Sequence, residues 1–287
     1  MNDITILSMD FEDSIKKFID KKFEIDNLRI LFPNFLLRED VLDLLDKYCT
    51  VVYYPLLGEE NNGFRLKEVP LADGTLRDFV FINTAQAMEK QLFTAAHELG
   101  HIWNVDEFVI GDLAIQDSYD LREHIINRFA AALLMPADEF RASVKIGLGE
   151  LGNPETKTIT YANLLKLIVV LMNQFFVPMK SVVFRLVELG FFRREMAKAL
   201  FGHKTIPAKE IEKRIAGLAK ELGYTKLLQP SMKKWIESLS EFLDIAEKDN
   251  LVSPNKIRVM REKFELTLTA AVTPEMNNVV PLTAQEG

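Results

Sequence analysis

Apolar positions recur at helical spacing at the start of the chain. Residues 12–31 and 37–48 place apolar side chains every three or four positions among acids and lysines, which predicts two helices separated at Pro33. Three short segments rich in β-branched and aromatic residues follow, separated by turn residues, and they predict a small antiparallel sheet. These segments are TVVYYPL (50–56), GFRLKEVP (63–70) and RDFVFIN (77–83). Helices before and after such a sheet are typical of an α+β domain.

Two amphipathic helices are expected directly after the sheet. Over residues 86–103 one apolar stripe is formed by Met88, Leu92, Ala95, Leu99 and Ile102. Residues 120–136 predict a second helix that ends at Pro136, and another helix is expected to start there.

The rest of the chain is predicted to be helical. A Gly- and Pro-rich stretch at 147–158 reads as a loop, and two helices flank Val177–Pro178. Farther on, one stripe ends at Gly223, a second runs from Trp235 to Ala246, and Ser253 with Pro254 predicts a third helix start. The expected organisation has four parts. These are N-terminal helices (1–48), a core (49–150), a helical pair packed on or next to the core (158–201), and a helical C-terminal extension with a disordered tail (203–287).

Composition and charge narrow the class of protein. The chain has 287 residues and a net charge of −7. This acidic balance does not favour a protein that binds many phosphates of a nucleic acid. The single cysteine, Cys49, rules out an intrachain disulfide. The first residues lack the basic and apolar regions of a signal peptide, and the most apolar stretch, 164–177, is too short to cross a bilayer. We therefore expect a soluble cytoplasmic protein that binds neither membranes nor nucleic acid.

A DNA-binding module is the one nucleic-acid alternative, because basic residues follow residue 179. They are Lys180, Arg185, Arg193, Arg194 and Lys198. A helix-turn-helix would present such residues on one exposed face. The helix that carries the first two is largely apolar, so a packing role is favoured.

The strongest chemical signal is the sequence His97-Glu98-Leu99-Gly100-His101. Residues four apart lie above one another on a helix, so His97 and His101 can bring two imidazole nitrogens onto one cation. Glu98 lies about 100° around the helix, where it can reach a water at an open metal position and act as general base. This order predicts a catalytic Zn²⁺ site.

A catalytic zinc site needs a third protein ligand, and the next helix offers two. Glu123 and His124 are rivals for that position, and Asn127 lies one turn after Glu123, where it could orient a ligand as an outer partner. Glu123 could also be a surface acid near a helix N-terminus. Tyr119 and His203 are candidates for stabilising an oxyanion, although structural roles are favoured for both.

The strand FVFIN (79–83) immediately precedes the helix that carries the motif. If it lies at an edge of the sheet, it could bind an extended substrate through its backbone. The alternative is a core strand with nothing bound to it, and the sequence favours neither.

The motifs resemble those of ImmA/IrrE-type metallopeptidases. FVFINTAQAMEKQLFTAAHELGHIW (79–103) resembles the strand-then-helix segment of that family, and EHIINRFAAALLMP (123–136) resembles its second signature. FFVPMKSVVFRLVELGF (175–191) is similar to a third, weaker block. Ile126 departs from the pattern, since the family commonly has alanine there. The chain also lacks a recognisable N-terminal helix-turn-helix, and residues 203–287 match nothing familiar.

The resemblance implies a small gluzincin-like fold with His97, His101 and Glu123 as zinc ligands and Glu98 as the catalytic base. It also implies a cytoplasmic zinc endopeptidase that cleaves a protein, with a transcriptional repressor or regulator of a mobile element or stress response as its substrate. The alternative is a non-catalytic regulatory module that binds a partner protein and keeps a structural or vestigial metal site. The oligomeric state cannot be read from the sequence.

Overall fold

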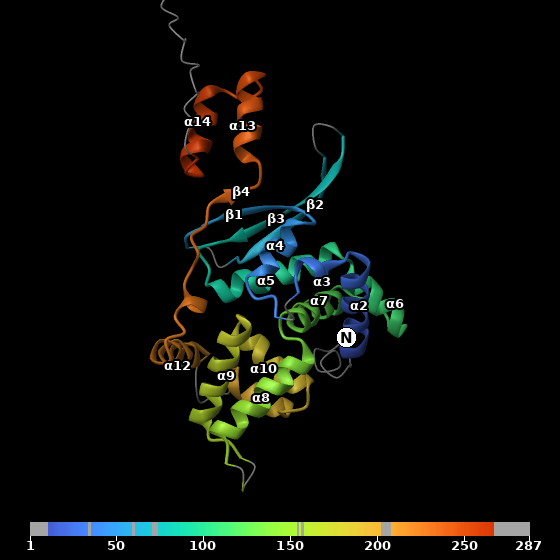
Figure 1. The fold of residues 1–287 in the computed structure, drawn as a ribbon, viewed down its shortest axis with the longest axis vertical. Helices are drawn as coiled ribbons and strands as arrows, with labels where there is room; N and C mark the ends of the chain where they lie inside the picture. Colours follow the sequence, from blue (N-terminus) through green and yellow to red (C-terminus); the bar gives the residue numbers. More distant parts are fainter. Residues whose placement is uncertain are drawn as a thin grey trace, which may run out of the picture. The chain divides into compact units, whose positions relative to one another are not determined.

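The α+β fold is confirmed by the computed structural model, which describes most of the chain in two units. The described residues are 11–33, 36–58, 61–70, 74–153, 155, 158–201 and 208–266. Contacts divide the chain into a first unit of residues 1–237 and a second unit of residues 238–287. The first unit contains the sheet and the helices that carry the motifs (Figure 1).

The first unit consists of one small sheet and the helices packed with it, of which α4 and α5 contact the sheet directly. Before and within the sheet come α2 (Glu12–Ile25), α3 (Leu28–Leu31), α4 (Asp40–Asp46), β1 (Thr50–Tyr54), β2 (Gly63–Pro70) and β3 (Leu76–Asn83). The helices of the motif region are α5 (Met88–Ile102), α6 (Val105–Leu113) and α7 (Tyr119–Leu134). After them come α8 (Ala137–Leu151), α9 (Tyr161–Phe175), α10 (Met179–Glu188), α11 (Arg194–Leu200), α12 (Ala208–Glu221) and β4 (Trp235–Ile236).

The sheet is mixed, whereas the strand pattern of the sequence predicted an antiparallel sheet. Its strand order is β2-β3-β1-β4. β2 and β3 form an antiparallel hairpin, but β1 pairs with β3 in parallel and with β4 antiparallel. β3 lies between β1 and β2 in the sheet. Because β2 runs opposite to β1 and β3 runs opposite to β2, β3 runs parallel to its neighbour β1.

β3 is an internal strand, so the idea that 79–83 forms a substrate-binding edge is wrong. It is paired on both sides, and its inward side chains Val80 and Ile82 are fully buried. β2 lies at the edge of the sheet on that side. The sequence indicates that residues 79–83 form a strand, but the position of that strand in the sheet depends on pairing between residues that are distant in the sequence.

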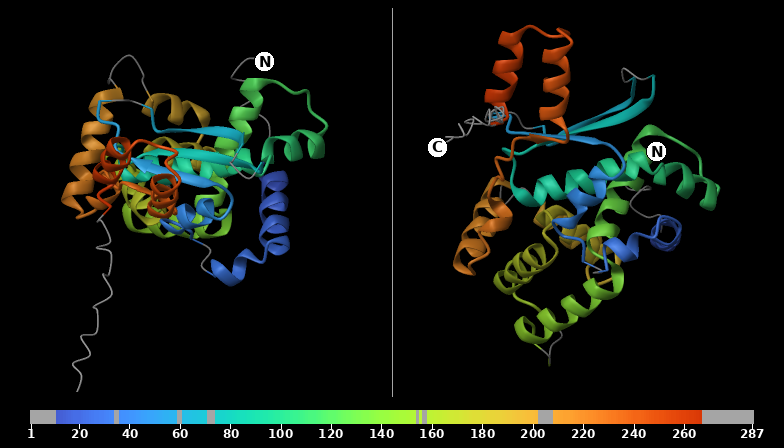
Figure 2. Two further views of the ribbon diagram at one scale, coloured as in Figure 1. Left: turned by 90° about the horizontal axis from the view of Figure 1, so that it is seen from above. Right: turned by 45° about the horizontal axis from the view of Figure 1, so that its top comes forward.

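α5 packs between the sheet and α7, as Figures 1 and 2 show. Leu92, Ala95 and Leu99 from the predicted stripe are fully buried. The motif helix α5 is therefore in contact with the sheet on one side and with α7 on the other. Each side therefore constrains where the polar residues of α5 can point.

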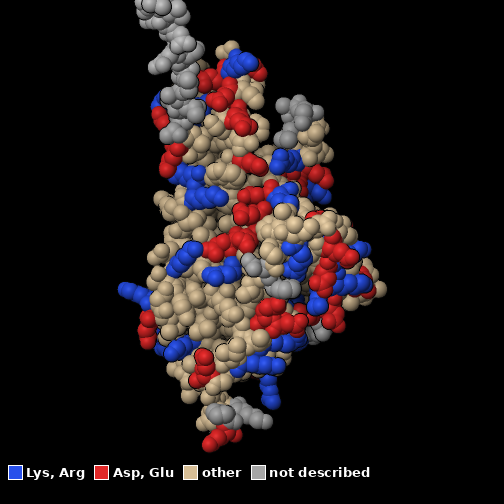
Figure 3. Space-filling model, in the orientation of Figure 1, with Lys and Arg blue, Asp and Glu red and all other residues tan. Residues whose placement is uncertain are grey.

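Arg185 of α10 is buried, which removes it from any exposed basic face. Its side chain is 1% exposed, forms an ion pair with Glu12 of α2, and lies 3.1 Å from a Glu188 oxygen. Its Nε also donates to the carbonyl oxygen of Met135 at 3.1 Å. The packing role favoured from the sequence is therefore correct for Arg185. In the view of Figure 3, basic and acidic side chains are interspersed.

Residues 229–236, the strap segment, run from the start of α5 to the edge of β1. The backbone N–H of Met88 donates to the Gln229 carbonyl oxygen at 3.0 Å, and Ser231 Oγ donates to Gln91 Oε1 at 2.8 Å. Thr84 Oγ1 donates to the Lys233 carbonyl oxygen at 2.8 Å, and β4 then pairs with β1. The strap segment is thus hydrogen-bonded to the N-terminal end of the motif helix.

The described residues of the second unit, 238–266, form the helices α13 (Leu239–Lys248) and α14 (Pro254–Lys263). Pro254 is the first residue of α14 and Ser253 is at its N-cap position, as predicted. The helix predicted from Trp235 begins later, at Leu239, because Trp235 belongs to β4. The predicted disordered tail lies outside the described residues from 267 onward.

Among the described residues, no single helix has the length and hydropathy needed to cross a membrane. The pair α9 and α10 reaches that threshold only when taken together, and it is bent by 102°. Most residues of α9 are buried inside the first unit.

Candidate metal centre

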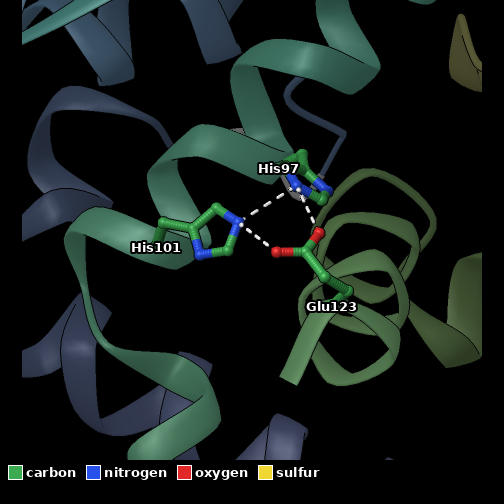
Figure 4. Close-up of side chains that lie close together, drawn as sticks. All are labelled: His97, His101 and Glu123. Atoms are coloured by element: carbon green, nitrogen blue, oxygen red, sulfur yellow. Dashed lines mark hydrogen bonds and ion pairs between the residues drawn. The ribbon is translucent and has the colours of Figure 1, made fainter. Parts of the chain in front are cut away.

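His97 and His101 lie one turn apart on α5 and point toward the same space. Their Nε2 atoms are 3.1 Å apart, and their side chains are 19% and 24% exposed. Both rings lie off the apolar stripe that packs α5 into the core. The expected pairing of the two imidazoles is therefore present (Figure 4).

Glu123 reaches the same space from α7. Its Oε2 atom lies 3.5 Å from His97 Nε2, and its Oε1 atom lies 3.5 Å from His101 Nε2. α7 begins just before it, where the Ser118 hydroxyl accepts a hydrogen bond from the Leu121 N–H at 3.3 Å. Two helices distant in sequence thus place their polar groups face to face (Figure 4).

These three residues form a group that could hold a metal ion, with all ligand atoms within 4.8 Å of one another. Zinc bonds of roughly 2.0–2.1 Å in a tetrahedral site put neighbouring ligand atoms about 3.3 Å apart. The two imidazole nitrogens are 3.1 Å apart, and each lies 3.5 Å from a different oxygen of Glu123, which is close to that spacing. Two imidazoles and one carboxylate also leave one position open, as in catalytic zinc sites.

Gly100 allows α5 and α7 to approach closely enough for this grouping. A Cβ atom at Gly100 would lie 2.7 Å from Phe129 Cδ1 and 3.2 Å from Ile126 Cδ1. Ile126, the departure from the family pattern, is fully buried at this contact. The isoleucine is accommodated because residue 100 has no side chain.

Asn127 connects two members of the group. Its Oδ1 lies 3.2 Å from His97 Nδ1, and its Nδ2 donates to the Glu123 carbonyl oxygen at 2.8 Å. A proton on His97 Nδ1 then donates to Asn127, which leaves the Nε2 lone pair directed toward Glu123 and His101. This is the arrangement in which an outer partner orients a metal-binding histidine.

Glu98 is buried beside the group, with 8% of its surface exposed. Burial raises the pKa of Glu98, while the nearby charges of His97 and Arg65 oppose that rise. A carboxyl group with an elevated pKa can accept a proton and later release it, which suits general acid–base chemistry.

The ionisation of the other two residues favours metal binding. Burial lowers the pKa of His101, and the charge of His97 lowers it further. The proximity of His97 lowers the pKa of Glu123 in the metal-free site, against the opposing effect of burial. A neutral imidazole and an ionised carboxylate are the forms that coordinate a cation.

His124 does not join the group, although it was the rival to Glu123. Its ring contacts Phe11 edge-on, with centroids 6.1 Å apart. Tyr119, the first residue of α7, is 76% exposed and lies one turn before Glu123. His203 lies outside the described residues.

Two charged residues near the site carry no motif signal. Arg122 lies 2.7 Å from Asp117 and 2.5 Å from Asp106, which fixes the segment before Glu123. Arg65 of β2 lies on the sheet face that α5 covers. Arg65 could have been identified as a residue near the candidate site only from the register between β2 and β3.

A comparison with protein-family models identifies the part of the chain that contains the candidate site. Residues 46–186 match the family model described as the IrrE N-terminal-like domain of peptidase family M78. Among curated proteins, none matches the chain.

One similar solved structure is a Mycobacterium tuberculosis transcriptional regulator, with 18% identity and a TM-score of 0.37. The match covers 62% of this chain and 52% of that one, so the chain spans about half the length of the regulator. The family match covers strands β1 to β3, the motif helix and the helix that carries Glu123. Through residues 46–186, the chain belongs to the ImmA/IrrE-type metallopeptidase family.

Proposed function

We propose that this protein is a zinc-dependent endopeptidase that hydrolyses a peptide bond in a protein substrate. The observation that carries the proposal is the grouping of His97, His101 and Glu123 at 3.1–3.5 Å, with buried Glu98 beside it. As the substrate we propose a transcriptional repressor or regulator in the cytoplasm, the class that the family resemblance implies.

In this proposal, His97, His101 and Glu123 would hold the metal, and Asn127 would orient His97. A zinc ion bound there would polarise the scissile carbonyl and acidify a water. Glu98 accepts the proton of the attacking water and delivers it to the departing amine. Burial of Glu98 supports this role because it raises the affinity of the carboxylate for a proton.

The decisive experiment compares wild type with Glu98→Gln, both loaded with zinc. We expect about one zinc per chain in each, because Glu98 is not a proposed ligand. Incubation with candidate repressors encoded beside the gene, followed by intact-mass spectrometry, should show cleavage by wild type alone. Removal of zinc with a chelator should stop cleavage, and added zinc should restore it.

Glu150→Gln provides the matched control, because Glu150 is an exposed acid on α8. It should cleave like wild type. Cleavage by zinc-loaded Glu98→Gln would remove Glu98 from the mechanism. Stable capture of an intact partner by zinc-loaded wild type, unaffected by the chelator, would instead favour the non-catalytic binding module.

A further inference from the structure

Arg65 lies on the inner face of edge strand β2. It pairs with Val80 of β3, and Gly63 pairs with Ile82. Val80 and Ile82 are fully buried, so Arg65 and Gly63 share the face that packs toward α5. The intervening Phe64 is 43% exposed and belongs to the opposite face.

β2 approaches α5 closely just before the candidate site. A Cβ atom at Gly63 would lie 2.7 Å from Thr94 Cγ2. Arg65 is two residues farther along the strand, about 6.6 Å away. Glu98 is one helical turn after Thr94, roughly 6 Å along α5. β2 also contacts α5 directly, so Arg65 lies on the strand next to the helix that carries the motif.

Asp78 fixes the orientation of the Arg65 guanidinium. Arg65 Nε and Nη2 donate to Asp78 Oδ2 at 3.2 and 2.7 Å, and both side chains are 15% exposed. Asp78 Oδ1 also accepts the Glu68 N–H at 2.7 Å. Among the described residues, none accepts a hydrogen bond from Arg65 Nη1.

We propose that Arg65 is a substrate-binding residue whose Nη1 donates a hydrogen bond to a backbone carbonyl oxygen of the peptide next to the scissile bond. The proposal rests on the proposed peptidase function. Asp78 balances the charge of Arg65, so the pair suits a neutral carbonyl better than a carboxylate. The substrate class is therefore an extended peptide that is bound through its main chain, independently of its side chains.

The test measures ligand binding instead of cleavage. The cobalt(II)-substituted protein would be titrated with two probes, a hydroxamate attached to a dipeptide amide and the small acetohydroxamate, and followed by its visible spectrum. Arg65→Gln and Arg65→Lys should bind the dipeptidyl probe roughly ten- to a hundredfold more weakly. Both should bind acetohydroxamate like wild type. Arg65→Lys retains a positive charge beside Asp78, so weaker probe binding by this variant cannot be attributed to an unpaired Asp78 that unfolds the protein.

Arg77→Gln provides the control, since Arg77 lies on the opposite face of the neighbouring strand β3 and is 44% exposed. It should bind both probes like wild type. If both Arg65 variants bind the dipeptidyl probe as tightly as wild type, the assignment of Arg65 fails and the peptidase proposal stands. If wild type binds neither metal nor acetohydroxamate, both proposals fail together.

Discussion

His97 Nδ1 and Asn127 Oδ1 lie 3.2 Å apart, so a residue of α7 fixes the ring of a residue of α5. Asn127 also donates to the Glu123 carbonyl oxygen one turn earlier on its own helix. The same amide thus links the two helices that supply the proposed ligands. Its effect on metal binding can be separated from its effect on folding, because Asn127 is exposed.

Replacing Asn127 with alanine should weaken zinc binding by about 10- to 100-fold, because the His97 ring loses the partner that sets its tautomer. A competition titration with a zinc indicator would measure the change. The melting temperature of the metal-free protein should stay close to that of wild type. An unchanged zinc affinity would show that Asn127 has no orienting role.

Glu123→Ala should lose most of its zinc, because the variant removes one of three donors that lie within 4.8 Å of one another. His124→Phe is the matched control, since phenylalanine keeps a ring against Phe11 and removes both nitrogens. Zinc content by mass spectrometry should stay near wild type in that control. Loss of zinc from His124→Phe with retention in Glu123→Ala would reverse the assignment of the third ligand.

Gly100→Ala should destabilise the protein and weaken zinc binding together. The added methyl would lie 2.7 Å from Phe129 Cδ1, so the Phe129 ring or the two helices must shift. We expect a loss of about 1–3 kcal/mol in the free energy of unfolding, measured by denaturant titration.

Gly111→Ala is the control for that variant. Gly111 lies in α6 with nothing within 4 Å of an added Cβ, so alanine should leave stability unchanged or raise it by up to about 1 kcal/mol. Equal losses in the two variants would mean that the close approach at Gly100 has no special role.

The stability of the metal-free protein should depend on pH through Glu89. This side chain in the first turn of α5 is 5% exposed, and burial raises its pKa from 4.5 to about 7. The folded state therefore binds the proton more strongly than the unfolded state. The stability contributed by that proton is complete below pH 4.5 and is lost as the pH rises through about 7.

Glu89→Gln removes this dependence, because glutamine stays neutral. The variant should gain melting temperature relative to wild type at pH 8 but not at pH 4.5, as measured by thermal denaturation at both values. Exposed Glu150→Gln should show a similar difference from wild type at both. A Glu89→Gln gain that is equal at the two pH values would contradict the assignment.

The sequence predicted which residues meet at the candidate site, for two different reasons. His97 and His101 are paired by the helical repeat alone, which is local and reliable. Glu123 was distinguished from His124 by the family resemblance, and the structure brings it to the histidines across a contact that depends on Gly100. The metal-binding and catalytic roles of these residues stay predictions until they are measured.

The arrangement of the sheet could not be predicted in the same way. Strand segments were identified by composition, but their order depends on pairing between distant residues, so β3 could be assigned neither to the edge nor to the centre. Arg65 was missed because its face is set by that register. The strap segment was missed because a two-residue strand such as β4 has no measurable periodicity.

The contacts of Arg185 predict that residues 46–186, the part that matches the family model, are unstable on their own. Residues 46–186 contain Arg185 and every residue of the candidate site, but neither of its acidic partners, Glu12 and Glu188. A truncated protein of those residues would lose both carboxylate partners of Arg185 together with the packing of α2, and we expect this loss to destabilise it. It would also end before the strap segment that anchors the start of α5. An attempt to isolate the candidate site in a minimal fragment should therefore retain residues 11–237.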